Sequence, residues 1–415
     1  MGYTKHAIQG AGWNGALQVA TTVLAALKIA ILARILSPND FGLFALVAVA
    51  IGIVESLTET GINQTIIQSK KSLSYFIDTA WVISIIRGLL ISIIMILMGF
   101  AMRYIYDSPQ LFVLVGVSSL IPLIKGFINP AIVSLQRDLR FFRDSVFKLL
   151  RLIVEVGSTI FLALILQSVF ALVYGLIVSA VFEVVLTFVM FRERPKLLYL
   201  RSRAQEIFDN MRGLNLMAIL SYVAENIDSL IVGKVVGTSA LGIYQNTYGF
   251  THKLNLQLSK SVQHSTFPVY ARIHQDLQRL RRAYLRTLGF SITAFIVIAI
   301  PFFLFPRLTI LILLGENWLE AVPLMRPLLL AGIVQSVVSI SSALLVARRE
   351  YFWLNTNLVI TTLSMTVLVI LLGSQFGLIG VVFGVLLARL LALPAVLLGV
   401  YRTLQHSLSV RKWRP

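Results

Sequence analysis

Apolar residues occur in long blocks along this chain, and short polar breaks separate the blocks. Stretches such as 88–102 and 358–373 are mostly apolar on all sides, rather than striped as in an amphipathic surface helix. About 20 helical residues cross the hydrocarbon core of a bilayer, and the blocks have that length. We therefore predict about twelve transmembrane helices. They cover 10–36, 41–67, 76–101, 111–135, 146–166, 170–191, 213–236, 241–267, 284–314, 322–346, 352–374 and 378–401.

A short motif occurs at matching places in the two halves of the chain. Phe41-Gly42-Leu43-Phe44 follows the first predicted helix, and Leu241-Gly242-Ile243-Tyr244 follows the seventh. Arg34 and Lys234 precede the two motifs at the same distance. Halves that each hold an even number of helices enter the membrane from the same side and are related by an axis along its normal.

These observations predict an all-α integral membrane protein of two six-helix bundles. The bundles are expected to be related by a pseudo-two-fold axis, with a central cavity between them that opens alternately to each side. The predicted domains are 1–203, which includes a basic connector, and 204–415.

Composition and charge agree with a membrane protein. Of 415 residues, 57% are hydrophobic and 13% are charged, whereas about 25% charged residues is usual in soluble proteins. The net charge of +18 comes from cations in alternate loops, so we expect no nucleic acid partner. Since cytoplasmic loops are enriched in Lys and Arg, both termini are predicted to be cytoplasmic. The loops on the opposite side contain only two cations, Arg103 and Arg307. The cationic loops contain Lys70, Lys71, Arg137, Arg140, Arg143, Arg192, Arg194, Lys196, Arg201, Arg203, Arg272, Arg279, Arg281, Arg282, Arg348 and Arg349.

The chain lacks the sequence patterns of the common membrane-associated chemistries. It has no Walker A loop, no His-Glu-x-x-His and no Gly-x-Ser-x-Gly. It also has no cysteine, which excludes a disulfide framework and thiolate metal ligands. We predict that the protein is not an enzyme and needs no cofactor or metal.

Several cations lie within or at the ends of predicted helices, where a charge at mid-bilayer costs about 2.5–3.5 kcal/mol. Such residues usually face a partner or a watery cavity. Lys28 lies deepest in its helix, whereas Arg34 and Lys234 lie near helix ends and could snorkel to the interface. The predicted cationic cavity that binds an anionic headgroup consists of Lys28, Arg34, Lys234, Lys253 and Lys260.

Carboxylates accompany these cations in the first two helices of each half. They are Glu55, Glu59, Glu225 and Asp228. Two interpretations stay open: they couple transport to a proton or sodium ion, or they form fixed ion pairs with the cations. Isolated charges occur elsewhere in the spans, at Arg87, Lys125, Glu155, Glu183 and Arg389.

The segment from Arg34 to Phe44, Arg-Ile-Leu-Ser-Pro-Asn-Asp-Phe-Gly-Leu-Phe, resembles the first-loop signature of the polysaccharide transporter family. That family contains the O-antigen and exopolysaccharide repeat-unit flippases of the multidrug/oligosaccharidyl-lipid/polysaccharide exporter superfamily. Later segments are similar to it in the same order. They are Glu59-Thr60-Gly61-Ile62-Asn63-Gln64, Leu135-Gln136-Arg137-Asp138-Leu139-Arg140-Phe141, Asn226-Ile227-Asp228, Leu241-Gly242-Ile243-Tyr244, Phe267-Pro268 and Gly315-Glu316-Asn317-Trp318.

The resemblance implies a bacterial inner-membrane protein whose first, second, seventh and eighth helices line the cavity. It also implies an undecaprenyl-pyrophosphate-linked oligosaccharide as substrate, moved by alternating access in O-antigen, capsule or exopolysaccharide biosynthesis. Membrane lipids, a coupling proton or sodium ion, and a polysaccharide polymerase are the implied partners.

Two other functions are considered. One is a drug/cation antiporter of the same superfamily, but an acidic, aromatic cavity is expected there and this chain has an excess of Lys and Arg. The other is a membrane-embedded polysaccharide polymerase or ligase, for which a sizeable outer loop is expected. The predicted outer loops here are short.

Overall fold

The computed structural model describes residues 2–57, 62–69, 71–209, 215–273 and 275–405. Within these residues the secondary structure is helical, without strands. The chain forms two compact units, Met1–Asn226 and Ile227–Pro415. The domain division predicted between residues 203 and 204 remains a prediction.

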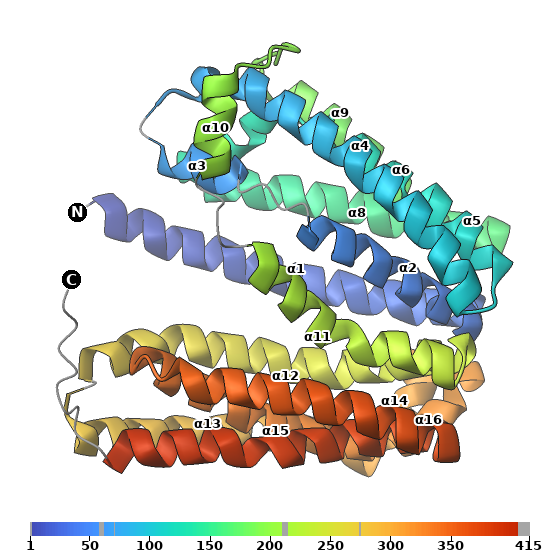
Figure 1. Cartoon of the computed structure of the whole chain (residues 1–415), viewed down its shortest axis with the longest axis vertical. Helices are drawn as coiled ribbons and strands as arrows, with labels where there is room; N and C mark the ends of the chain where they lie inside the picture. Colours follow the sequence, from blue (N-terminus) through green and yellow to red (C-terminus); the bar gives the residue numbers. More distant parts are fainter. Residues whose placement is uncertain (1, 58–61, 70, 210–214, 274, 406–415) are drawn as a thin grey trace. The chain divides into compact units, whose positions relative to one another are not determined.

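The first unit is built from long helices that pack in neighbouring pairs (Figure 1). Helix α1 packs on α8, α8 packs on α9, and α4 packs on α5 and α6. Small residues allow some of these pairs to approach closely, as is common between helices in membranes. The long helices are α1 (Gly2–Ile35), α2 (Pro38–Leu57), α4 (Leu73–Ile105), α8 (Phe141–Leu166) and α9 (Phe170–Met190), and the short helix α3 spans Ile62–Gln68.

The span predicted as one helix over 111–135 is broken. It consists of α5 (Pro109–Ser118), α6 (Leu120–Lys125), the 3₁₀ helix η1 (Pro130–Val133) and α7 (Ser134–Arg137). The two parts meet at a bend of 71°. The Asn129 side chain accepts a hydrogen bond from the amide of Ala131 at 3.0 Å and so caps η1. Pro130, which cannot donate a backbone hydrogen bond, follows that cap and restarts the chain in a new direction.

The basic connector of the first unit contains a short amphipathic helix, α10 (Arg201–Asp209), that the sequence analysis did not predict. Ala204 and Ile207 are buried in a small apolar core shared with α3 and α4. Glu206 on the same helix accepts a hydrogen bond from Lys71 at 2.6 Å. The connector is therefore anchored to the end of α4 rather than extended.

The second unit contains the later part of α11 and all the helices that follow. Helix α12 packs on α15, and α15 packs on both α13 and α16. Buried side chains of α12, α13, α15 and α16 form its core, including Tyr270, Tyr284, Leu344 and Val396. The helices are α11 (Asn215–Val235), α12 (Thr238–Ile273), α13 (Leu277–Leu304), α14 (Pro306–Leu313), η2 (Glu316–Ala321), α15 (Val322–Ala347) and α16 (Tyr351–Gln405).

Helix α16 has two arms that meet at Gly377, where φ is 60° and ψ is −142°. A residue with a Cβ rarely adopts that conformation, so a glycine is needed at this turn. The two arms correspond to the predicted helices 352–374 and 378–401.

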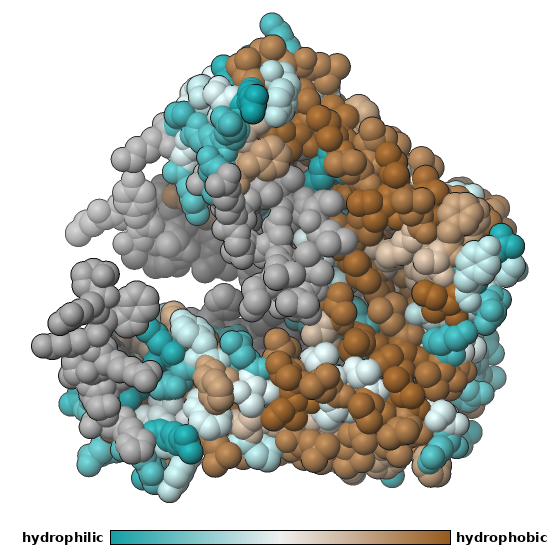
Figure 2. Space-filling model, in the orientation of Figure 1, coloured by the Kyte–Doolittle hydropathy of each residue, from teal (hydrophilic) through white to brown (hydrophobic). Residues whose placement is uncertain are grey.

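Eight helices of the described part of the chain are long and apolar enough to cross a membrane, or nine if the bent pair in the first unit is one span. Large hydrophobic side chains are exposed along them, as lipid-facing residues are, and Figure 2 shows such residues over much of the visible surface. The protein is a multi-pass membrane protein. Helices α11 and α12 are not among the eight.

Candidate functional site: a charge network in the first unit

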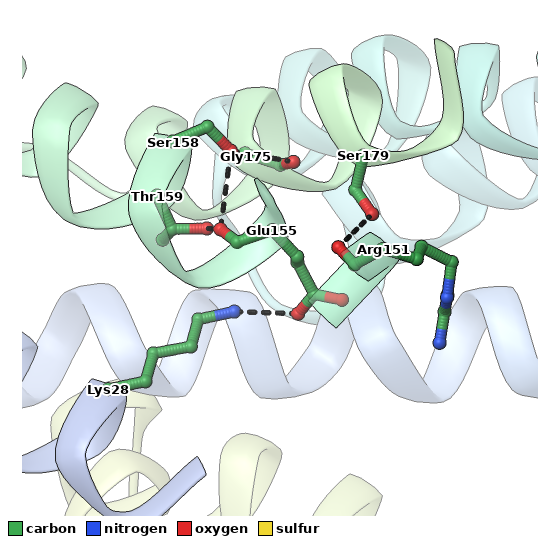
Figure 3. Close-up of polar contacts among 7 residues, drawn as sticks. All are labelled: Lys28, Arg151, Glu155, Ser158, Thr159, Gly175 and Ser179. Carbon is green, nitrogen blue, oxygen red and sulfur yellow. Dashed lines mark hydrogen bonds and ion pairs between the residues drawn. The ribbon is translucent and has the colours of Figure 1, made fainter. Parts of the chain in front are cut away.

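Lys28, the cation predicted to lie deepest in the membrane, forms an ion pair with Glu155. Its Nζ donates a hydrogen bond to Glu155 Oε1 at 2.8 Å, from the last third of α1 to the middle of α8 (Figure 3). Each side chain retains 16% of its exposure. The pair is therefore largely buried but still open to a small ligand or water on part of its surface.

The backbone of α8 around Glu155 is fixed by hydroxyl groups and by a glycine. Thr159 Oγ1 donates to the Glu155 carbonyl at 2.6 Å, and Ser158 Oγ lies 3.4 Å from the Gly175 carbonyl on α9. A Cβ at Gly175 would lie 2.9 Å from Thr159 Cα, so only glycine allows the two helices to be this close. Figure 3 shows these contacts on the side of α8 next to α9, with Glu155 reaching toward α1.

A second ion pair lies one helical turn away. Arg151 precedes Glu155 by four positions on α8, and its Nη1 lies 3.9 Å from Glu183 Oε2 on α9. Glu183 also interacts electrostatically with Lys125 and with Glu155. The two pairs therefore belong to one group of charges.

Three further helices contribute to this group. Lys125 Nζ at the end of α6 lies 3.7 Å from Glu55 Oε1 on α2. Arg87 Nη2 on α4 lies 3.4 Å from the backbone carbonyl of Glu55. Each of the six spans predicted in the first half thus contributes an ionisable side chain. The charge network, as we name it, consists of Lys28, Arg87, Lys125, Arg151, Glu55, Glu155 and Glu183.

The network corrects two interpretations of the sequence. Arg87, Lys125, Glu155 and Glu183 were interpreted as isolated charges, but each has a charged or carbonyl partner. The fixed-pair alternative assigned the cations to Glu55, Glu59, Glu225 and Asp228, whereas Lys28 pairs with Glu155.

Arg151 was not predicted as a site residue, although its four-residue spacing from Glu155 places both on one face of a helix. Four cations and three carboxylates leave the network with one net positive charge.

The second unit has a different polar arrangement, in which a buried acid and a buried base are linked through two tyrosines. Tyr244 Oη donates to Asp228 Oδ2 at 2.6 Å, and the Tyr244 and Tyr248 rings stack with centroids 5.4 Å apart. Arg389 donates to Tyr248 Oη at 2.6 Å and to the Ala331 carbonyl at 3.0 Å. Asp228 and Arg389 are only 2% and 8% exposed, so both ends of this tyrosine chain are buried.

The other predicted site residues that the structure describes lie on α1 and α11. Arg34 and Lys234 are exposed in the last turns of α1 and α11, and Glu225 is exposed on α11. Glu59 lies outside the described residues, as do the side chains of Lys253 and Lys260. In the part of the chain that the structure describes, no group of three or more His, Cys, Asp or Glu side chains could hold a metal ion.

This geometry suits reversible recognition of an anion. Lys28 can offer its remaining ammonium hydrogens while Glu155 holds it, because an ammonium group has three donors. A phosphate oxygen in place of the Glu155 carboxylate would also neutralise Lys28 and accept its hydrogen bond. Partial exposure of the pair leaves a route for that exchange.

Comparison with known proteins places the chain among proteins of polysaccharide export and synthesis. It is 22% identical to the lipopolysaccharide biosynthesis protein WzxC of Escherichia coli over 94% of this chain and 80% of that one. It is 20% identical to the teichuronic acid biosynthesis protein TuaB of Bacillus subtilis, over 87% and 76% of the two chains.

The fold is shared with two kinds of solved transporter structure. The lipid II flippase MurJ in an inward closed conformation aligns with a TM-score of 0.69 at 14% identity, covering 93% of this chain and 87% of that one. An inward-facing multidrug resistance MATE family transporter of the MOP superfamily aligns with a TM-score of 0.66 at 15% identity, covering 93% and 94%. A family model described as polysaccharide biosynthesis protein matches residues 31–323, and the chain belongs to that family.

Proposed function

We propose that this protein flips an undecaprenyl-pyrophosphate-linked oligosaccharide repeat unit across the bacterial inner membrane by alternating access. The transport step would serve the biosynthesis of O-antigen, capsule or exopolysaccharide. The family membership and the likeness to WzxC and TuaB support polysaccharide biosynthesis as the context, and the MurJ-like fold supports flipping of a lipid-linked substrate.

The observation that carries the proposal is the partly exposed Lys28–Glu155 pair within the spans. A lysine inside the hydrocarbon slab is costly, and an apolar residue would be cheaper if packing were its only role. A pyrophosphate supplies the negative charge that can take the place of the carboxylate. The sugars would occupy the watery path, and the polyprenyl chain would remain in the lipid.

The remaining members of the predicted site are part of the same proposal. Arg34, Lys234, Lys253 and Lys260 would add positive charge along the path of the diphosphate. The four carboxylates Glu55, Glu59, Glu225 and Asp228 would couple transport to a proton or sodium ion. Asp228 fits this role least well, because it is buried and already accepts hydrogen bonds from Tyr244 and from the amide and hydroxyl of Ser229.

The proposed architecture has twelve transmembrane helices in two six-helix bundles with both termini in the cytoplasm, and the domains 1–203 and 204–415. If α16 crosses the membrane twice, the eight apolar helices would supply nine spans, the bent pair a tenth, and the more polar α11 and α12 the last two. A polysaccharide polymerase would use the exported units.

Transport into proteoliposomes with a fluorescently labelled undecaprenyl-pyrophosphate-linked oligosaccharide tests the function. The wild-type protein is expected to expose labelled lipid on the opposite leaflet faster than protein-free vesicles do. Lys28→Ala should lower that rate, and Lys28→Arg should restore part of it because the positive charge returns. Equal rates in vesicles with and without wild-type protein would contradict the proposed function, and a wild-type rate in Lys28→Ala would remove Lys28 from the site.

A further inference from the structure

A basic pocket lies at the end of the first unit where α9 ends and where the chain passes from α7 into α8. Its volume is about 550 Å³. It lies apart from the charge network, and none of the seven network residues lines it. Its charged lining residues are Arg137, Asp138, Arg140, Arg143, Arg192 and Glu193.

The lining carries an excess of guanidinium groups. Four arginines line the pocket, against the carboxylates of Asp138 and Glu193. Arg140 lies 3.5 Å from Asp138, and both are exposed, so this ion pair is weak. Arg143 and Arg192 are exposed and form no ion pair with any residue that the structure describes. Their donors are therefore available to an anion.

The backbone around these arginines is ordered by its own hydrogen bonds. The amide of Arg140 donates to the Leu135 carbonyl at 2.7 Å, and the amide of Asp138 donates to the Ser134 carbonyl at 2.8 Å. On the other side of the pocket, the Asn129 side chain donates to the Glu193 carbonyl at 2.8 Å. An anion would thus meet a preformed pocket, which lowers the entropic cost of binding.

A stripe of exposed apolar side chains leads along α9 to the pocket. Its members are spaced three or four positions apart and so lie on one face of the helix. They are Tyr174, Val178, Val181, Val185 and Val189, and the last is 76% exposed. Met190 and Phe191, which follow directly, line the pocket itself. A ligand with a phosphate at one end and an acyl chain at the other matches this sequence of surfaces.

We propose that the pocket binds the phosphate headgroup of an anionic phospholipid, with its acyl chains along the exposed face of α9. Guanidinium groups match phosphate geometry bidentately, and basic pockets at the membrane surface bind such headgroups. The apolar stripe favours a lipid over a free phosphate ion as the source of the phosphate. None of the charge-network residues lines the pocket, so we assign it to structural or regulatory lipid rather than to the transported substrate.

Native mass spectrometry of the full-length protein, released from nanodiscs with equal amounts of phosphatidylglycerol and phosphatidylcholine, tests this site. The wild-type protein should retain phosphatidylglycerol preferentially. The double variant Arg143→Gln/Arg192→Gln should retain at least about threefold less of it, since it loses two guanidinium groups that can bind the phosphate bidentately. Arg281→Gln/Arg282→Gln on α13 removes the same charge from exposed positions of the second unit and should retain the wild-type amount.

The results of this experiment distinguish a phospholipid headgroup from a soluble phosphate as the ligand of the pocket. Equal retention of phosphatidylglycerol by the wild-type and the Arg143/Arg192 variant would overturn the proposal. If only the binding of inorganic pyrophosphate, measured by calorimetry, fell in that variant, the pocket would take a soluble phosphate and the lipid assignment would be wrong. Since lipid retention needs no transport, failure of the proposed flippase function would leave this result unchanged.

Discussion

Lys28 on α1 donates a hydrogen bond to Glu155 on α8 over 2.8 Å, although 127 positions separate the two residues in the chain. The carboxylate neutralises the lysine within the spans and occupies the position that a phosphate oxygen would take. Under the proposed function, Glu155 would compete with the substrate for Lys28, so substitution of Lys28 and substitution of Glu155 should have opposite effects on substrate binding.

Equilibrium binding of undecaprenyl pyrophosphate to the purified protein in detergent measures this competition. Lys28→Ala should weaken binding by about tenfold to a hundredfold, because a hydrogen bond to a charged group contributes about 1.5–3 kcal/mol. Glu155→Gln should strengthen binding, because it removes the competing negative charge. If both variants weaken binding to the same extent, the pair has only a structural role.

A matched control for this experiment lies on the same helix. Lys148 Nζ forms an ion pair with Asp144 Oδ2 at 2.6 Å. Lys148→Ala therefore also removes a lysine from an ion pair of α8, and it should leave the affinity for undecaprenyl pyrophosphate unchanged.

Gly175 should be required for the close packing of α8 and α9 beside Glu155. A Cβ there would lie 2.9 Å from Thr159 Cα, whereas a Cβ at Gly157 on α8 would meet no atom within 4 Å. Gly175→Ala should lower the free energy of unfolding by about 1–3 kcal/mol through overpacking. Gly157→Ala should be neutral or stabilising because alanine favours a helix. Thermal unfolding in detergent compares the two variants, and equal melting temperatures would contradict the expected close contact.

The hydrogen bond from Tyr244 to buried Asp228 should contribute more to stability than a neutral bond between hydroxyl groups. Tyr244→Phe removes a 2.6 Å bond to a carboxyl group, and Tyr284→Phe removes a 2.8 Å bond to Ser341. We expect Tyr244→Phe to cost about 1–3 kcal/mol, and Tyr284→Phe about 1 kcal/mol. If Tyr284→Phe lowers the melting temperature more than Tyr244→Phe does, the bond from Tyr244 to Asp228 is not the stronger of the two.

The contact that anchors α10 should weaken at high pH. The hydrogen bond to Glu206 raises the pKa of Lys71 above its ordinary value of 10.5. A raised lysine pKa means that the stabilising contribution is complete below pH 10.5 and is lost as the pH rises through the pKa of the folded protein. A spin label at Phe208→Cys, in this otherwise cysteine-free chain, should therefore become more mobile above pH 10.5.

Lys71→Arg provides the control for this titration. Arginine remains charged throughout the pH range of the experiment, so the spin label should keep its mobility in that variant. An identical increase of mobility with pH in both proteins would show that the ion pair does not anchor α10.

The helices could be predicted closely because transfer of a segment into lipid depends on the composition of that segment alone. The predicted helices 146–166 and 170–191 correspond to α8 and α9 within a few residues. The break within the span predicted over 111–135 is also local in origin, since Asn129 and Pro130 cap and restart the chain there. Hydropathy averages over such a break and does not reveal it.

The candidate site was predicted only in part. The cost of a buried charge identified Lys28, and the structure finds it in a largely buried ion pair. Its partner was not identified, because Glu155 carries no local sign that it faces α1 rather than α9. One available signal was overlooked: each predicted span of the first half contains an ionisable residue, which would be unusual for unrelated charges.

The sequence by itself determined that this is a helical membrane protein, how long its apolar spans are, and that Lys28 and Asp228 must each face a partner or a watery cavity. These properties follow from the free energy of placing each residue in lipid, which neighbouring segments change little. Only the tertiary structure decided that Lys28 meets Glu155, that Asp228 is linked through tyrosines to Arg389, and that four arginines surround one pocket. These contacts join residues far apart in the chain, and they depend on which helix faces pack together.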